Sequence, residues 1–191
     1  YVFHSSNLSF INNTFEENEY GIQLEVSNSN RVSSNRFNQI KEIAVFVRGG
    51  GNSITENEVR GALGGINIDA TAGGANDNLV EHNSVSNATE YGIGVWRAAN
   101  TIVRSNLVTR GKGVGIVVTE LASNNLIEAN QVTENEAGGI VLSEGASYNS
   151  IRGNTAKGNG DGVRFFDLAD TGSGNRWENN SYDTKTPGTL G

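Results

Sequence analysis

The chain has 191 residues, a formal net charge of −7 and no run of Lys or Arg, so it lacks the basic stripe that nucleic-acid-binding proteins present. Cysteine is absent, which excludes disulfides and zinc–thiolate sites. Only 36% of the residues are hydrophobic, and no apolar run approaches the ~18 residues of a membrane-spanning helix.

A repeat of 22 to 26 residues runs through the whole chain. Each copy has an asparagine with an apolar residue three positions before it and another, in one copy an alanine, two positions after it. A further apolar pair follows, from Ile22 and Leu24 in the first copy to Val163 and Phe165 in the seventh. A period in the low twenties indicates a solenoid. The asparagines are Asn13, Asn35, Asn57, Asn83, Asn106, Asn130, Asn154 and Asn180.

Three short strands are predicted in each coil. Apolar residues alternate there with polar or small ones, whereas a helix would space them by three and four. The inward positions are rich in β-branched residues, and the Leu-x-x-Leu-x-Leu run of leucine-rich repeats is missing. The pattern therefore predicts an all-β parallel β-helix of about eight coils, forming one domain over residues 1–191.

The aligned asparagine is expected to stand at a corner of each coil. Asparagine tolerates the left-handed backbone conformation that a sharp corner requires. Its amide can also donate to, and accept from, the asparagines in the coils above and below. We therefore expect a structural asparagine ladder along one edge of the solenoid.

The first coil, residues 1–24, has Phe10 and Phe15 at inward positions and no recognisable cap. An open coil exposes unpaired backbone groups and core side chains, which solenoids usually cover. We expect either that sequence upstream of Tyr1 is missing or that something else covers this end. End-to-end assembly of identical chains is one such cover.

The two 26-residue coils carry extra residues at 69–78 and 167–175, directly after the predicted third strand. Such insertions either build a binding surface or are plain tolerated loops. Oxygen atoms of Asp69, Asp77, Asp167 and Asp170 would suit Ca²⁺, but we favour the plain loops and expect no cofactor. At the end of the chain, Trp177 and Tyr182 are predicted to close the core, and Pro187 to stop strand pairing.

The pattern Asn-x-Ile-x-x-Asn-x-Val followed by Gly-Ile-x-Val resembles the repeats of NosD-like carbohydrate-binding proteins and sugar hydrolases, within the pectate lyase-like superfamily. The resemblance covers essentially the whole chain and implies a right-handed β-helix whose first sheet binds polysaccharide on its outer face. It does not settle activity, because many functions share this repeat.

Catalytic signatures of the relatives are missing. There is no Asn-Thr-Asp, Asp-Asp and Gly-His-Gly set of polygalacturonases, and no Asp-Pro-His of alginate epimerases. If the protein is an enzyme, the resemblance implies a polysaccharide lyase, a glycoside hydrolase or an epimerase.

The Gly-Ile-x-Val strands gather unusual residues on their predicted outer face. An exposed Trp96 would stack on a sugar ring, with Arg48 and Arg97 as charged contacts. Glu120 and Glu144 would lie in adjacent coils at roughly 5 Å, a separation compatible with retaining glycoside hydrolysis. The competing interpretation is a solvated ladder of alternating charges. The candidate catalytic residues are Asp69, Glu120 and Glu144.

Two functional hypotheses follow. The first is a secreted, periplasmic or cell-surface β-helix that binds, or binds and processes, an extended polysaccharide along one sheet face. The alternative is a non-enzymatic structural solenoid, such as an adhesin stalk or a fibre subunit that stacks end to end.

Overall fold

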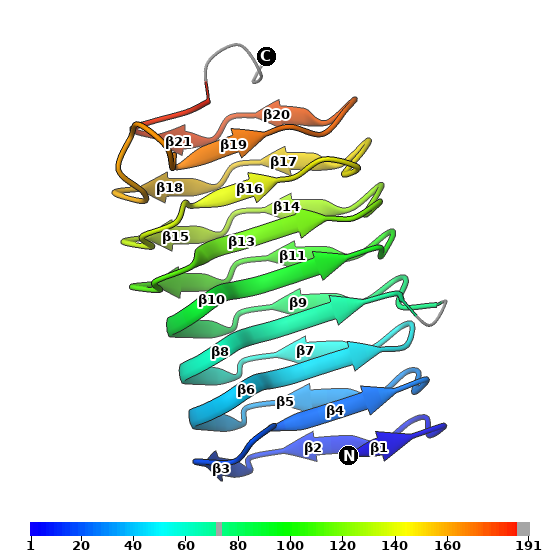
Figure 1. Cartoon of the computed structure of the whole chain (residues 1–191). Coiled ribbons are helices and arrows are strands. Elements are labelled where there is room, and N and C mark those ends of the chain that lie inside the picture. Colours follow the sequence, from blue (N-terminus) through cyan, green and yellow to red (C-terminus); the bar gives the residue numbers. More distant parts are fainter. Residues whose placement is uncertain (72–73, 187–191) are drawn as a thin grey trace.

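The computed structural model describes residues 1–71 and 74–186 and shows a stack of coils built from parallel strands (Figure 1). The predicted all-β parallel β-helix is confirmed, and the described chain contains no helix that is long and apolar enough to cross a membrane. One sheet has eight strands and lies at the back in Figure 1. Its strands are β2 (Ser9–Ile11), β5 (Arg31–Ser33), β7 (Ser53–Thr55), β9 (Leu79–Glu81), β11 (Ile102–Arg104), β14 (Leu126–Glu128), β17 (Ser150–Arg152) and β20 (Arg176–Glu178).

The other sheet has 13 strands and turns a corner, so that it forms both a side and the front of the stack. We call the front part the front sheet. It contains β1 (Val2–Phe3), β4 (Ile22–Glu25), β13 (Val114–Thr119), β16 (Ile140–Leu142) and β19 (Leu168–Asp170). The side contains β3 (Thr14–Glu16), β12 (Leu107–Thr109), β15 (Gln131–Thr133), β18 (Thr155–Lys157) and β21 (Ser181–Tyr182).

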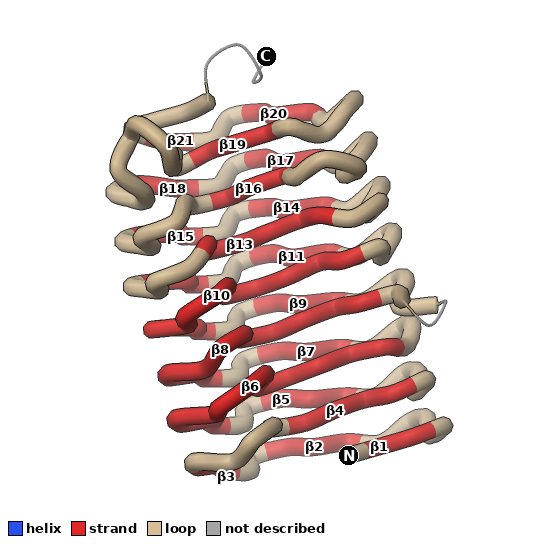
Figure 2. The backbone as a smooth tube through the Cα atoms, in the orientation of Figure 1, coloured by secondary structure: helices blue, strands red, loops and turns tan. Residues whose placement is uncertain are grey.

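Three long strands belong to both parts: β6 (Arg36–Arg48), β8 (Glu58–Asp69) and β10 (Ser84–Trp96). Figure 2 shows them passing the corner without an intervening loop. Five positions after the repeat asparagine, these coils carry the buried Ile40, Ala62 and Ala88, where two later coils carry Asn135 and Asn159. With a buried apolar side chain in place of the corner asparagine, the strand continues past the corner. Two of the three predicted strands therefore merge in these coils.

The core is a narrow file of apolar side chains. Residues three positions before the repeat asparagine are fully buried from Val32 to Ile151, and successive coils pair them in register. In the front sheet, Ile93 and Ile116 are likewise fully buried and paired in register. Each such burial stabilises the fold by about 1.5–3 kcal/mol, which is how a chain with few hydrophobic residues maintains a continuous core.

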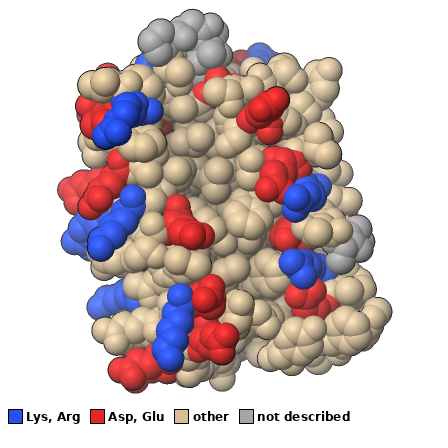
Figure 3. Space-filling model, in the orientation of Figure 1, with Lys and Arg blue, Asp and Glu red and all other residues tan. Residues whose placement is uncertain are grey.

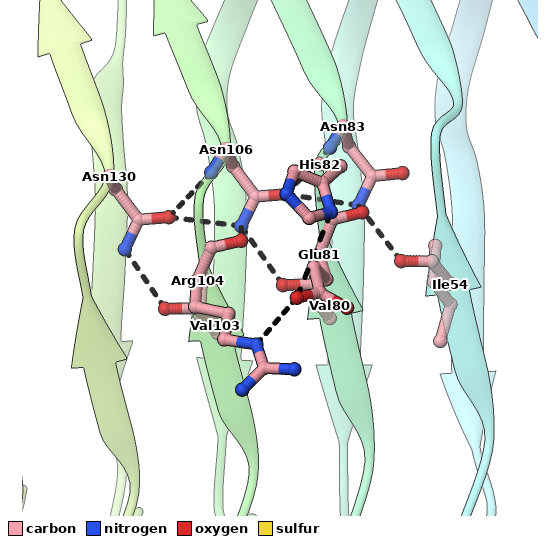
Figure 4. A network of polar contacts seen from close by, with 9 residues as sticks. All are labelled: Ile54, Val80, Glu81, His82, Asn83, Val103, Arg104, Asn106 and Asn130. Atoms are coloured by element: carbon pink, nitrogen blue, oxygen red, sulfur yellow. Dashed lines mark hydrogen bonds and ion pairs between the residues drawn. The ribbon is translucent and has the colours of Figure 1, made fainter.

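The predicted asparagine ladder is confirmed and is shown for three coils in Figure 4. The Oδ1 atom of Asn106 accepts from the backbone N–H (2.9 Å) and the Nδ2 (3.0 Å) of Asn83. Its own Nδ2 donates to the carbonyl of Val80 at 2.9 Å. The conformational part of the expectation is wrong, because the left-handed residue is the one before the asparagine: φ is 55° at His82 and 54° at Ser105.

Two further ladders stand at other corners. One lies five positions before the predicted ladder and is interrupted by Thr101, which is fully buried. The other lies five positions after it, where Asn135 bonds to Asn159 and Asn159 bonds to Asp167. In the later coils, each corner therefore uses the same device. The members of the interrupted ladder are Asn30, Asn52, Asn78, Asn125, Asn149 and Asn175.

The last long coil differs from the prediction. Val163 and Phe165 were expected as the apolar pair of the front sheet, but β19 occupies that place and pairs Ile140 with Leu168. Val163 and Phe165 are 79% and 42% exposed. The extra residues precede the strand in a loop, 160–166, in which the Asp161 carboxylate accepts the backbone N–H groups of residues 163, 164 and 165.

Both ends of the stack show aromatic residues. At the first coil, Phe15 stacks on Phe37 at 4.9 Å, and β1, β2 and β3 each pair with a strand on one side only. At the last coil, Trp177 packs against the core and its Nε1 donates to Asp170 at 2.8 Å, while Tyr182 is 37% exposed. Pro187 lies outside the described residues.

Candidate functional site

The outer face of the front sheet brings together most of the predicted site residues. Strand register places Glu25, Arg48, Asp69, Trp96 and Thr119 in one row across five coils. Arg48 is one residue beyond the printed pairs of β6 with β8, and its side chain reaches Asp69. Figure 3 shows that charged side chains gather along the two margins of this face, while its middle is largely uncharged.

A chain of ion pairs runs along one margin. Arg48 contacts Glu25 at 3.3 Å and Asp69 at 3.4 Å. Arg97 contacts Asp69 at 3.8 Å and also pairs with Glu120. The structure thus shows the ladder of alternating charges that was the competing interpretation of these residues.

Asp69 lies at the centre of this chain of ion pairs. Its side chain is only 5% exposed, and besides the two guanidinium groups it accepts from the backbone N–H of Thr71 at 2.8 Å and from the Thr71 hydroxyl. All of these contacts stabilise a carboxylate that acts as an anchor for two arginines.

The other two candidate carboxylates lie at the strand ends. Glu120 is exposed and bound by Arg97, whereas Glu144, one coil further on, is exposed and makes no hydrogen bond or ion pair with the described residues. No contact within the described chain joins Glu120 to Glu144. Glu120 and Glu144 therefore lie on neighbouring turns, and their role as a catalytic pair stays a prediction.

The four aspartates considered for Ca²⁺ do not come together. Asp167 and Asp170 are buried, and their oxygens accept hydrogen bonds from Asn159, Thr184 and Trp177. Asp77 is an exposed corner residue. Within residues 1–71 and 74–186, no three His, Asp or Glu side chains are grouped to hold a metal ion.

An aromatic and polar cluster occupies the middle of the face. We call Phe46, Arg48, Asn67, Tyr91 and Trp96 the outer-face cluster. The Arg48 guanidinium lies 4.6 Å from the Phe46 ring centroid, and the Tyr91 and Trp96 rings are 5.3 Å apart. Phe46, Asn67 and Tyr91 are nearly buried although they lie on the outer face of the sheet; Arg48 lies over the Phe46 ring, and Asn67 bonds to the Tyr91 hydroxyl.

Tyr91 reaches this face through a bulge. The register between β8 and β10 shifts between Ala88 and Tyr91, and such bulges re-aim side chains. Gly64 and Gly94 provide the space, since a Cβ atom on Gly64 would lie 2.5 Å from the Tyr91 Oη. The Tyr91 hydroxyl accepts from Asn67 Nδ2 at 3.1 Å, and burial raises the pKa of Tyr91 above its usual range.

Three polar atoms of the cluster are buried without a hydrogen-bond partner: Arg48 Nε, Asn67 Oδ1 and Trp96 Nε1. Only one other buried side-chain atom in the described chain shares this property, Thr101 Oγ1 in the interrupted ladder. An unpartnered buried polar group costs about 1–3 kcal/mol, so such groups are rare and each calls for an explanation, such as a water, an ion or a ligand that completes it.

Hollows in the surface are the other candidate binding sites. A small one of about 90 Å³ adjoins Arg48 and Asp69. Two larger ones, of about 460 and 550 Å³, lie on another side around Thr14, Arg36 and Glu58. Their arginines are exposed and paired with Glu58, and no unpartnered buried atom lines them. The outer-face cluster is therefore the stronger candidate.

Sequence reasoning missed Tyr91 and assigned no role to Asn67. It also expected Trp96 to be exposed, whereas the ring is half-buried against Tyr91. The signal was present in two glycines, Gly64 in the preceding coil and Gly94 three residues after Tyr91 in the same strand, which leave room for a large ring.

A family model described as "Right handed beta helix region" matches residues 1–74 and 44–182. A comparison with curated proteins finds no match.

Proposed function

The chain belongs to the right-handed β-helix family, and we propose that it binds an extended glycan across the outer face of the front sheet. One observation carries this proposal: Arg48 Nε, Asn67 Oδ1 and Trp96 Nε1 are all buried and unpartnered, and they lie on three adjacent coils. Sugar hydroxyls both donate and accept hydrogen bonds, so they can complete all three.

The surroundings suit a sugar ring. Tyr91 and Trp96 supply aromatic surface, and binding sites for small molecules and sugars combine such surface with a few convergent polar groups. Arg48, a member of the cluster, and Arg97 beside it lie along one margin of the face. Because parallel strands repeat at about 4.8 Å, a chain of sugar units can run along several coils of the stack.

We propose non-covalent binding without turnover. Asp69 and Glu120 are engaged by arginines, and Glu144 stands apart from both in its contacts. Extended glycans are found mainly outside the cytoplasm, so an extracellular, periplasmic or cell-surface location accompanies this proposal.

The test is a glycan array probed with the wild type, Trp96→Ala and Tyr148→Ala. Tyr148 is an exposed aromatic corner residue outside the cluster, so its variant is the matched control. We expect Trp96→Ala to lose glycan retention and Tyr148→Ala to keep it, with Trp96→Ala less stable than the wild type, because its ring packs on Tyr91, but still folded at the temperature of the assay. Retention of no glycan by the wild type, or equal retention by all three proteins, would overturn the proposal.

A second candidate function is end-to-end assembly. The strands β1, β2 and β3 have one free pairing side within the described chain, and Tyr1 and Phe3 beside them are exposed. Strand edges of this kind can pair with another chain. Sedimentation at increasing concentration tests it, since a mass that stays monomeric throughout would remove this candidate.

A further inference from the structure

We infer that the outer-face cluster selects a neutral, hydroxyl-rich glycan over an acidic one. This inference rests on the proposed function and adds the chemical class of the ligand.

The first argument is charge. An acidic glycan needs cations with free capacity, but Arg48 in the cluster and Arg97 beside it are both already paired. Arg48 lies between Glu25 and Asp69, and Arg97 lies between Asp69 and Glu120. Three carboxylates therefore accompany two guanidinium groups, and the whole chain carries a formal charge of −7.

The charges that surround the centre of the cluster are also negative. Burial is the main reason that the pKa of the Tyr91 hydroxyl is raised, and the negative charges of Glu90, Asp69 and Glu42 raise it further. A carboxylate of a bound glycan placed beside this hydroxyl would be repelled by the same three carboxylates. A neutral sugar avoids this repulsion.

The second argument is hydrogen-bond chemistry. Two of the unpartnered atoms, Arg48 Nε and Trp96 Nε1, are donors, while Asn67 Oδ1 is an acceptor. A hydroxyl group both donates and accepts, so neighbouring hydroxyls satisfy all three. A carboxylate accepts only and would place its oxygens against Asn67 Oδ1. The set of partners therefore matches a diol and not a uronate carboxylate.

The experiment measures dissociation constants for hexasaccharides at low and high salt. The neutral probes are glucan, mannan and galactan fragments, and the acidic probes are oligogalacturonate and oligoalginate. We expect a neutral probe to bind with less than about a twofold change between 20 and 500 mM NaCl, because little net charge pairing is involved. The acidic probes should not bind measurably.

A charge variant sharpens the result. Glu25→Gln keeps the shape of the side chain but releases one carboxylate from Arg48, to which it is bound at 3.3 Å. We expect this variant to show measurable, salt-sensitive binding of an acidic probe at low salt, and to keep its affinity for the neutral probe within about twofold.

Each outcome separates the two proposals. Tighter binding of an acidic probe by the wild type would overturn the neutral assignment and leave glycan binding in place. Binding of no hexasaccharide, together with a blank array, would overturn the proposed function and this inference with it.

Discussion

The side-chain oxygen of Asn130 accepts two hydrogen bonds from Asn106 in the preceding coil, one from its backbone N–H and one from its amide, both at 3.0 Å. Because the same geometry recurs in neighbouring coils, each asparagine is at once an acceptor for one coil and a donor to the next.

Replacing Asn106 by Ala should destabilise the fold. The change removes the acceptor of the Asn83 N–H and the donor to the Val80 carbonyl, both in the buried corner. Leaving buried groups unpaired costs about 1–3 kcal/mol each, so the urea midpoint should fall clearly. Gln131→Ala, an exposed change in the adjacent strand, is the control. Equal midpoints for the two variants would contradict a stabilising role of the ladder.

Replacing Thr101 by Asn should stabilise the fold. Thr101 is fully buried, its hydroxyl has no partner, and it stands where a ladder amide would link Asn78 to Asn125. An added amide that makes these bonds should raise the free energy of unfolding by about 1 kcal/mol. Thr101→Val removes the hydroxyl without adding an amide and serves as the reference. A lower urea midpoint for the asparagine variant than for Thr101→Val would show that the corner has no room for the amide.

Alkaline pH should destabilise the protein through Tyr91. Burial raises the pKa of this hydroxyl in the folded protein, so its contribution is fully present below the ordinary tyrosine pKa of about 10 and is lost as the pH rises above it. In an absorbance titration, a late tyrosinate transition should be present in the wild type and in Tyr148→Phe but missing in Tyr91→Phe. A late transition that survives in Tyr91→Phe belongs to another residue.

Replacing Asp161 by Ala should loosen the loop of residues 160–166. Backbone N–H groups of Phe165, Arg164 and Val163 hold the pKa of the Asp161 carboxyl well below its usual range. Its contribution is therefore present above the ordinary pKa of Asp and is lost as the pH falls below it. At neutral pH, trypsin should cut after Arg164 faster in Asp161→Ala than in the wild type. Glu136→Ala, in another coil, should match the wild type; equal rates for all three would show that the carboxylate does not order the loop.

Much of the fold is predictable because one repeat position is nearly invariant. The asparagines from Asn13 to Asn180 are evenly spaced, and only stacked coils can use such spacing. The last long coil was predicted wrongly because Val163 and Phe165 imitate the strand pattern, whereas the Asp161 hydrogen bonds make a loop of them. Alternation in sequence does not reveal where a local side chain captures the backbone.

The candidate site was less predictable. Alternation correctly placed Arg48, Asp69 and Trp96 on the outer face, and their spacing made the ion-pair chain foreseeable. The burial of Asn67 beneath Tyr91 was not foreseeable, because it depends on a bulge and on the space left by Gly64. Periodicity describes regular strands, and the cluster is built where one strand departs from regularity.

The left-handed residues at the corners have a practical consequence. They stand one position before each ladder asparagine, outside the core, and they include chemically diverse side chains such as those of Glu56, His82 and Ala129. Equivalent corner residues of successive coils form a column in which neighbours are spaced by about 4.8 Å. Since the chain has no cysteine of its own, a single cysteine introduced at any of these positions would attach a probe at a known distance along the solenoid axis.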